Sequence, residues 1–371
     1  MRILAHSTSG NSLQHQAQQG HVLHTRKPWM QHGLFAVVFM GTLGTLDTKA
    51  QDVHFGQFFN APLVINPANA GDMDGDQRFA IIHREQWRSL GSPFRTDAFS
   101  YDTPLLEGKL GKGRYLGVGV NAFSDRAGAA RFGDTQANLS VSYAIRSGEA
   151  SLLAFGLQGG YGQRSAQFDG LRWDSQYNGA WYDPDLPTNE AVPNSSSRFV
   201  DFGAGVLVKG ELKSGLRWKG GASAFHLNEP TVSLFGGAED QLMRRFVAHG
   251  ELRIEGKRWI WLPKFFVAQQ GTSREINVGG LLHRRIGVDS RYTTDKNSSA
   301  IYLGAFYRVG DAIVPTLQFE WERRFVGAIS YDVNISKLRA QTMYRGAMEV
   351  SLQYIGVFRD KRMRLPKGGV R

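Results

Sequence analysis

Apolar and polar residues alternate along most of the chain that follows residue 51. The clearest stretch is 135–146, where Leu139 and Val141 occupy odd positions and Asn138 and Ser140 occupy even ones. A period of two residues is typical of a β-strand with one apolar and one polar face. No stretch after residue 51 has a convincing helical period. The pattern therefore predicts an all-β protein.

Segments of this kind predict about fourteen strands, each near the ~10 residues that cross a bilayer at a tilt. The predicted strands are 78–87, 94–104, 113–124, 134–146, 150–164, 198–211, 216–227, 244–256, 259–269, 274–287, 300–309, 313–322, 323–334 and 346–358. Their second face is rich in Gly, Ser, Asn and Gln, which suits the wet lumen of a barrel. We therefore predict a transmembrane antiparallel β-barrel over residues 78–358.

The connectors between the predicted strands differ in length. Those at 147–149, 255–257 and 310–311 are tight, whereas 165–197 is long and rich in aromatic residues. Outer-membrane barrels carry short turns at one end and long loops at the other. Because Trp and Tyr dominate binding hot spots, the long loop is a candidate surface for a partner, or else a folded lid whose aromatics pack together. Its candidate binding residues are Trp173, Tyr177, Trp181 and Tyr182.

Aromatic residues also lie near the ends of the predicted strands, where they indicate the girdles of a membrane barrel. They are Tyr101, Tyr115, Tyr161, Trp218, Trp259, Trp261, Tyr292, Tyr307 and Trp321. A secreted β-sandwich pair or a propeller would alternate in the same way. A propeller would repeat a motif about every 40–45 residues, and the chain has no such repeat.

The first fifty residues have a different composition. Arg26 and Lys27 precede an apolar run at 33–46, and Ala50 follows as a small residue. These features predict a secretory signal peptide over residues 1–50 with an unusually long leading region, and a buried core helix is the alternative. Residues 51–77 contain many Asn, Pro and Gly turns, so they predict a periplasmic segment or a plug, or else a simple leader to the first strand.

Composition and charge exclude several classes of function. The chain has no cysteine, which excludes disulfide scaffolds, Cys-ligated metals and Cys nucleophiles. Its formal net charge is +11. In an exported protein this surplus favours anionic lipid headgroups or an acidic partner over nucleic acid. The candidate cations are the doublets 244–245, 284–285 and 323–324 and the basic tail 359–371.

Several positions are candidates for roles in the lumen. Arg84 and Trp87 predict a partner-binding site with a cation–π contact, or alternatively a plug salt bridge and a girdle residue. Asp332 and Glu349 are expected to face the lumen beside Arg308 or Lys337. The glycine-spaced stretches 117–121 and 156–162 predict small lumen residues rather than phosphate loops. We expect no catalytic residue, metal or cofactor, because the histidines are scattered and no carboxylates have metal-ligand spacing.

Two blocks of sequence resemble the PorP/SprF family of outer-membrane proteins. The first opens at residue 51 and ends at the Arg84–Trp87 motif, and the second lies at 304–349. The matching positions include Asn66, Pro67, Gly71, Gln86, Asp311, Tyr331 and Asp332. The chain departs from the family at its tail, which lacks the family's cysteine.

The resemblance implies a fourteen-stranded outer-membrane barrel that is part of, or a partner to, the type IX secretion and gliding machinery. It also implies that the protein docks or anchors a secreted adhesin with a type B C-terminal domain, without catalysis. A transport channel for small solutes is the main alternative, which an open lumen lined by ordered charge would favour. An outer-membrane hydrolase is a third class, and it would need a nucleophile beside a base.

Overall fold

The computed structural model describes residues 52–88, 92–147, 151–168, 171–188, 195–213, 215–234, 240–286 and 299–357. The predicted signal peptide, the basic tail and Tyr292 lie outside these residues. Among the described residues, no helix combines the length and apolarity that a membrane crossing requires.

The strands form one closed antiparallel barrel in which each strand pairs with its neighbours in the chain and β1 pairs with β14. Their bounds are β1 Gln77–Gln86, β2 Phe94–Leu105, β3 Arg114–Arg126, β4 Gly133–Ser147, β5 Ser151–Ser165, β6 Ser196–Lys213, β7 Leu216–Phe225, β8 Arg245–Glu255, β9 Ile260–Gln270, β10 Ser273–Ile286, β11 Ser299–Arg308, β12 Ala312–Trp321, β13 Phe325–Asn334 and β14 Arg345–Gly356. Every predicted strand is confirmed within two residues at each end.

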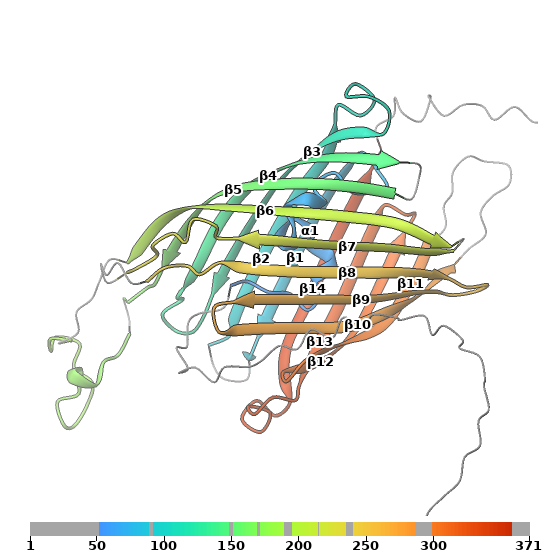
Figure 1. Ribbon diagram of the computed structural model, residues 1–371. Helices are drawn as coiled ribbons and strands as arrows, with labels where there is room; N and C mark the ends of the chain where they lie inside the picture. Colours follow the sequence, from blue (N-terminus) through green and yellow to red (C-terminus); the bar gives the residue numbers. More distant parts are fainter. Residues whose placement is uncertain are drawn as a thin grey trace, which may run out of the picture. The chain divides into compact units, whose positions relative to one another are not determined.

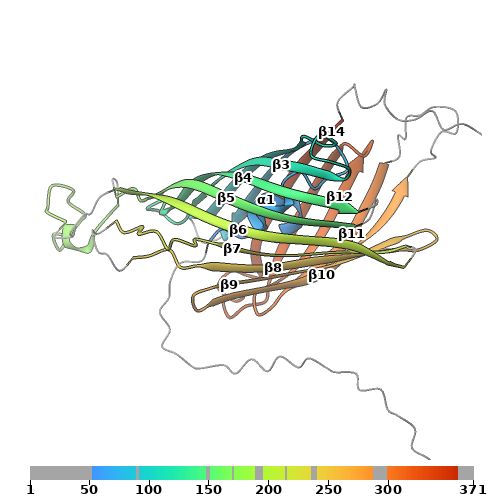
Figure 2. The ribbon, with the colours of Figure 1, turned by 45° about the horizontal axis from the view of Figure 1, so that its top comes forward.

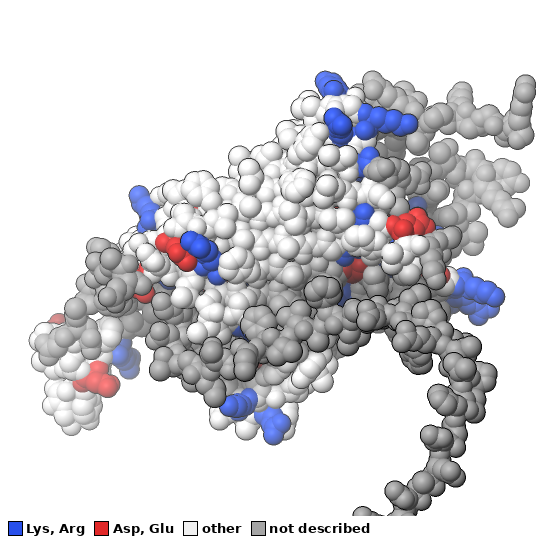
Figure 3. Space-filling view, in the orientation of Figure 1, with Lys and Arg blue, Asp and Glu red and all other residues white. Residues whose placement is uncertain are grey.

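The alternation of the sequence separates the two faces of the barrel. On β4, Leu139 and Val141 are exposed on the outside, whereas Asn138 and Ser140 are buried inside. The same division holds on β14, where Val350 is exposed and Glu349 is buried. Figure 3 shows Lys and Arg gathered toward the strand ends, with a broad uncharged area between them. The apolar face therefore forms the outer surface that contacts lipid.

The barrel has two distinct ends, which we name by their connections. The terminal end is where β1 begins and β14 ends, and the loop end carries the β5–β6 connection with η4 (Asp174–Gln176). That connection extends beyond the strands at the left of Figure 1. The prediction that connector length separates the ends is wrong at 310–311, since this tight turn lies at the loop end. In an up-and-down barrel, connections alternate between ends by strand order rather than by length.

The predicted aromatic girdle is correct for the residues on the outer face. Trp261, Trp321 and Tyr161 are more than half exposed there. Tyr115 is a wrong member, because its side chain is 1% exposed and packs inside the barrel with Ala68. Position 115 lies on the inward face of β3, so proximity to a strand end did not identify its direction.

Residues 52–76 run through the lumen, and we call them the plug segment. They contain η1 (Phe58–Asn60), α1 (Pro62–Ile65) and η2 (Pro67–Asn69), and most of their side chains are buried. The strands surround the segment with α1 in Figure 1, and again in the turned view of Figure 2. The small and polar inner face of the barrel therefore contacts protein along this segment.

Candidate functional site

The turn around η2 fits into a groove of small residues on neighbouring strands. Ser142 on β4 pairs with Gly156 on β5, which pairs with Gly205 on β6. Ser142 Oγ donates a hydrogen bond to the Ala70 carbonyl at 2.8 Å. A Cβ on Gly156 would lie 2.5 Å from the carbonyl carbon of Pro67. These positions are small because the plug backbone lies directly against the sheet.

Two matched glycines on β5 give a test of this fit. Gly156 faces the plug, whereas Gly159 faces outward with its nearest neighbour, the Phe202 ring, 3.9 Å from an added Cβ. We expect Gly156→Ala to destabilise the barrel by about 1–3 kcal/mol, because the methyl group overpacks the groove. Gly159→Ala is expected to change stability little. The measurement is the temperature at which half of the barrel has shifted from its folded to its unfolded mobility on a gel. Equal midpoint temperatures for the two variants would show that the plug does not pack against Gly156.

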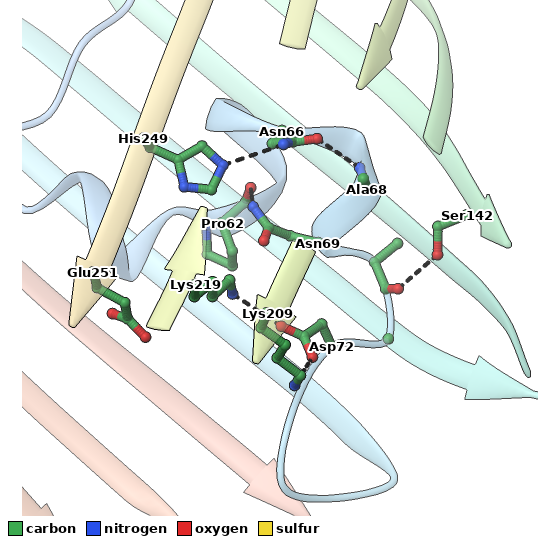
Figure 4. Close-up of polar contacts among 12 residues, drawn as sticks. Pro62, Asn66, Ala68, Asn69, Asp72, Ser142, Lys209, Lys219, His249 and Glu251 are labelled. Carbon is green, nitrogen blue, oxygen red and sulfur yellow. Dashed lines mark hydrogen bonds and ion pairs between the residues drawn. The ribbon is translucent and has the colours of Figure 1, made fainter. Parts of the chain in front are cut away.

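Asn66 is the central polar residue of this turn (Figure 4). Its Oδ1 accepts a hydrogen bond from the backbone N–H of Ala68 at 2.9 Å and so caps η2. Its Nδ2 donates to the Val206 carbonyl at 2.9 Å and lies 3.2 Å from His249 Nε2. The amide of Asn66 thus connects the turn to β6 and β8, and this explains the Asn-Pro pair in the sequence.

The plug is also held near the terminal end of the barrel. Asp72 forms ion pairs with Lys209 on β6 and Lys219 on β7, which Figure 4 shows beside the plug. Although burial alone would raise the pKa of Asp72, the two ammonium groups hold it below its usual range. Gly71 has φ +75° and donates its N–H to Asp102 at 2.8 Å. This left-handed backbone explains a glycine at position 71.

A buried ionic cluster, which we call the latch, joins the plug to the strands where the barrel closes. Glu349 on β14 is fully buried and accepts hydrogen bonds from the backbone N–H groups of Gly56 and Gln57 at 2.7 and 2.8 Å. It also forms an ion pair with Arg84 on the adjacent strand β1. Arg84 in turn lies 3.1 Å from Asp332. The plug therefore depends on charges from the first and the last strands.

Arg308 extends the latch to the loop end of the barrel. It forms ion pairs with Asp332 and, at 2.5 Å, with Asp311. Asp332 and Glu349 thus face the lumen, with Arg308 rather than Lys337 as the partner of Asp332. Arg84 forms plug-linked ion pairs, as in the salt-bridge alternative, while the Trp87 ring packs on Phe94 with centroids 5.0 Å apart.

A second ionic cluster holds the start of the plug at the loop end. Asp52 lies 3.0 Å from Arg245 and 3.1 Å from His226, whose Nδ1 is 3.0 Å from Asp201. Arg245 is 5% exposed, so its predicted role at lipid headgroups is wrong, and it contacts the plug instead. Its neighbour Arg244 is exposed near Glu229. The two residues differ because Arg245 is the first residue of β8 and is buried, whereas Arg244 lies just before the strand.

This cluster predicts a pH dependence of plug retention. Burial alone would lower the pKa of His226, but Asp201 and Asp52 raise it from 6.5 to about 9. The stabilisation from protonated His226 is therefore complete below pH ~6.5 and is lost as the pH rises through about 9. We expect openings of the plug, measured as conductance in planar bilayers, to become more frequent between pH 7 and 10. His226→Gln should remove this dependence of plug opening on pH. An unchanged pH dependence in the variant would show that His226 is not its cause.

Of the remaining predicted residues, Gln86 contacts the latch through Arg84, and the loop aromatics and Tyr331 do not belong to it. Tyr177 and Trp181 in the long loop are 58% and 66% exposed, and Arg172 lies over the Tyr182 ring at 5.0 Å. Trp173 is partly buried at the start of η4. Gln86 accepts a hydrogen bond from Arg84 at 3.3 Å. Tyr331 faces outward and is 42% exposed.

The chain is similar to several solved structures at low identity. A KdgM porin in complex with disordered oligogalacturonate matches with 7% identity over 75% of this chain and 98% of that chain, at a TM-score of 0.35. A TodX deltaS2S3 mutant, a monoaromatic hydrocarbon channel, matches with 10% identity over 81% and 94%, at 0.44. A FadL homologue of Pseudomonas aeruginosa matches with 10% identity over 78% and 92%, at 0.39. No curated protein sequence matches the chain.

The family comparison covers nearly all of the barrel. The sequence model of the type IX secretion system membrane proteins PorP/SprF matches residues 47–354, which include the plug segment and nearly all of β14. The resemblance in the opening block and the carboxy-terminal half is thereby confirmed. The chain belongs to the PorP/SprF family and is an outer-membrane β-barrel of the type IX secretion system.

Proposed function

We propose that this barrel docks a secreted surface protein, an adhesin with a type B C-terminal domain, and keeps it at the cell surface beside the type IX and gliding machinery. The observation that carries the proposal is the lumen filled by residues 52–76. Buried contacts hold this segment at both ends, at Asp52 and at Asp72. A barrel closed in this way suits binding at its surface better than passage of solutes, and the proposal assigns it no catalytic step.

The proposal places the loop end outside the cell. Short periplasmic turns and longer external loops are usual in outer-membrane barrels. The longest described connection, between β5 and β6, belongs to the loop end and presents Tyr177 and Trp181 to solvent. Exposed aromatic residues of this kind act as anchors in protein interfaces. The signal peptide over residues 1–50 would direct the chain to the Sec route.

A disulfide that fixes the plug to the barrel wall distinguishes the docking function from a transport function. An added Cβ on Gly205 would lie 3.0 Å from Asn66 Cγ, a spacing that suits a disulfide in the double variant Asn66→Cys/Gly205→Cys. The natural chain has no cysteine, so no native thiol competes for this disulfide. We expect the oxidised variant to retain its secreted partner on cells and to co-purify with it after gentle solubilisation. In planar bilayers the oxidised variant should not conduct.

The reduced form of the same variant is the matched control. If the plug moves to admit solutes, oxidation should abolish uptake or conductance that the reduced form supports. The docking proposal would be overturned by that result if, in addition, the tagged barrel purified from cell envelopes carries no secreted protein. The protein would then be a channel for small solutes.

A further inference from the structure

A cavity of about 460 Å³ opens at the loop end of the barrel, above the start of the plug segment. Val53 and His54 of the plug line it, together with residues near the loop-end ends of β1 to β5, β10 and β11. Its volume falls in the range of sites that enclose a ligand. The predicted pair Arg84 and Trp87 both line it.

The lining combines aromatic rings with charged groups. Trp87 and Phe94 form an edge-to-face pair on one wall, and Arg164 lies over the Phe132 ring at 5.6 Å on another. Arg164 is also held by Asp134 through two hydrogen bonds of 2.9 and 2.7 Å. Arg84 and Arg308 belong to the latch, so these three cations already have carboxylate partners. The fourth arginine of the lining, Arg274, donates a hydrogen bond to Gln269 at 2.8 Å.

Two carboxylates of the lining lack such partners. Asp125 accepts a hydrogen bond from Thr96 Oγ1 at 2.5 Å, and Glu275 Oε1 is buried without a hydrogen-bond partner. Neither carboxylate forms an ion pair with the residues that the structure describes. Arg308, only 3% exposed, also keeps an Nη1 without a hydrogen-bond partner. The lining thus holds five carboxylates against four arginines, with two of the carboxylates outside any ion pair of the described residues and one donor unused.

We propose that this cavity receives a basic segment of the secreted partner polypeptide, which rests on the docking function proposed above. A Lys or Arg side chain of the segment would pair with Asp125 or Glu275, and a main-chain carbonyl would accept from Arg308. The aromatic wall would pack against the aliphatic stem of the basic residue. Because the chain after the predicted signal peptide still carries a net positive charge, a basic ligand is repelled by most of the surface and is bound where carboxylates lack ion-pair partners.

The test measures binding of a defined probe to the purified full-length barrel in detergent. The probe is a fluorescent peptide with four lysines, and a peptide of equal length with four glutamates is its counterpart. We expect the lysine peptide to bind and the glutamate peptide not to bind. Glu275→Gln and Asp125→Asn should each weaken binding of the lysine peptide about tenfold, the scale of a lost charge pair in a partly desolvated site.

The control variant is Glu229→Gln, which neutralises an exposed carboxylate at the same end of the barrel but outside the cavity. It should bind the lysine peptide as the wild type does. Equal binding by the wild type and the Glu275→Gln/Asp125→Asn double variant would overturn the proposal, as would no binding by the wild type.

Blocking the cavity with a bulky label tests the binding site without changing any charge of its lining. Ala127→Cys places the only thiol on the cavity wall, and a bulky maleimide there should block the lysine peptide. Ala340→Cys, on an exposed loop at the same end, is the matched control and should bind normally after labelling. Continued binding to the labelled Ala127→Cys barrel would contradict the cavity site.

Retention of the secreted protein on cells is measured in the same variants. A wild-type barrel that retains no secreted protein would overturn the docking function, while the peptide assay still decides whether the cavity binds basic segments. If the wild type and the double variant retain the secreted protein equally although the peptide no longer binds, docking stands and the cavity is not its contact. Loss of both in the double variant supports the proposal.

Discussion

Replacing Glu349 with alanine is expected to lower the stability of the barrel by about 3–5 kcal/mol, the scale of breaking a buried ion pair by removing one of its partners. The substitution removes the carboxylate that pairs with Arg84 and accepts hydrogen bonds from Gly56 and Gln57. Arg84 is 2% exposed, so water has little access to it, and its remaining carboxylate, Asp332, is shared with Arg308. The measurement is the thermal midpoint of unfolding on semi-native gels, with conductance recorded in parallel.

Glu85→Ala is the control for this variant. Glu85 lies next to Arg84 in the chain but forms an ion pair with the exposed Arg95 at 3.2 Å. Surface pairs of this kind contribute about 0–1 kcal/mol, so its midpoint should change little. Equal midpoints for Glu349→Ala and Glu85→Ala would show that the latch does not hold the barrel closed around the plug.

Deleting residues 55–70 is expected to change a closed barrel into a conducting one. The deletion removes α1 and both short 3-10 helices, and it leaves a lumen lined by polar and small residues such as Asn138, Ser142 and Gly156. Water can hydrate this face once the plug is absent. The measurement is single-channel conductance in planar bilayers, where the wild type should remain closed.

Deleting residues 171–187 from the long loop is the control, because this loop does not fill the lumen and its loss should leave the barrel closed. If the plug deletion does not assemble, Gly117→Val/Gly156→Val/Gly205→Val keeps the full chain and obstructs the groove instead. A folded barrel that remains closed in both plug variants would show that residues 52–76 are not what seals the lumen.

The strands could be predicted from local pattern because the two sides of the wall meet different surroundings. Lipid selects Leu139 and Val141 on the outside, and the interior selects Asn138 and Ser140, so the alternation is present in the sequence itself. The predicted orientation of these faces is confirmed. The pattern leaves open whether residues 51–77 form a plug or a periplasmic segment, because polar and small residues suit a packed polar segment as well as water. In the structure, residues 52–76 fill the lumen.

The site was only partly predictable for the same reason. Asp332 and Glu349 were expected in the lumen because the alternation places them on the polar face of their strands. By contrast, Gly56 and Gln57 gave no local sign that they bond to Glu349 from nearly three hundred residues away. Gly117 and Gly156 were expected to be small lumen residues. Their contact with the plug backbone depends on where a separate segment lies, which periodicity does not encode.

By itself, the sequence determined the all-β class, the fourteen strands, the direction of each face and the family. These properties depend on residues close together in the chain and on the difference between lipid and a polar interior. Only the tertiary structure decided that residues 52–76 fill the lumen, that Arg84 joins the latch, and that Asp125 and Glu275 share one cavity. Those properties arise when closure of the barrel brings distant strands together, so long-range geometry determines them rather than local composition.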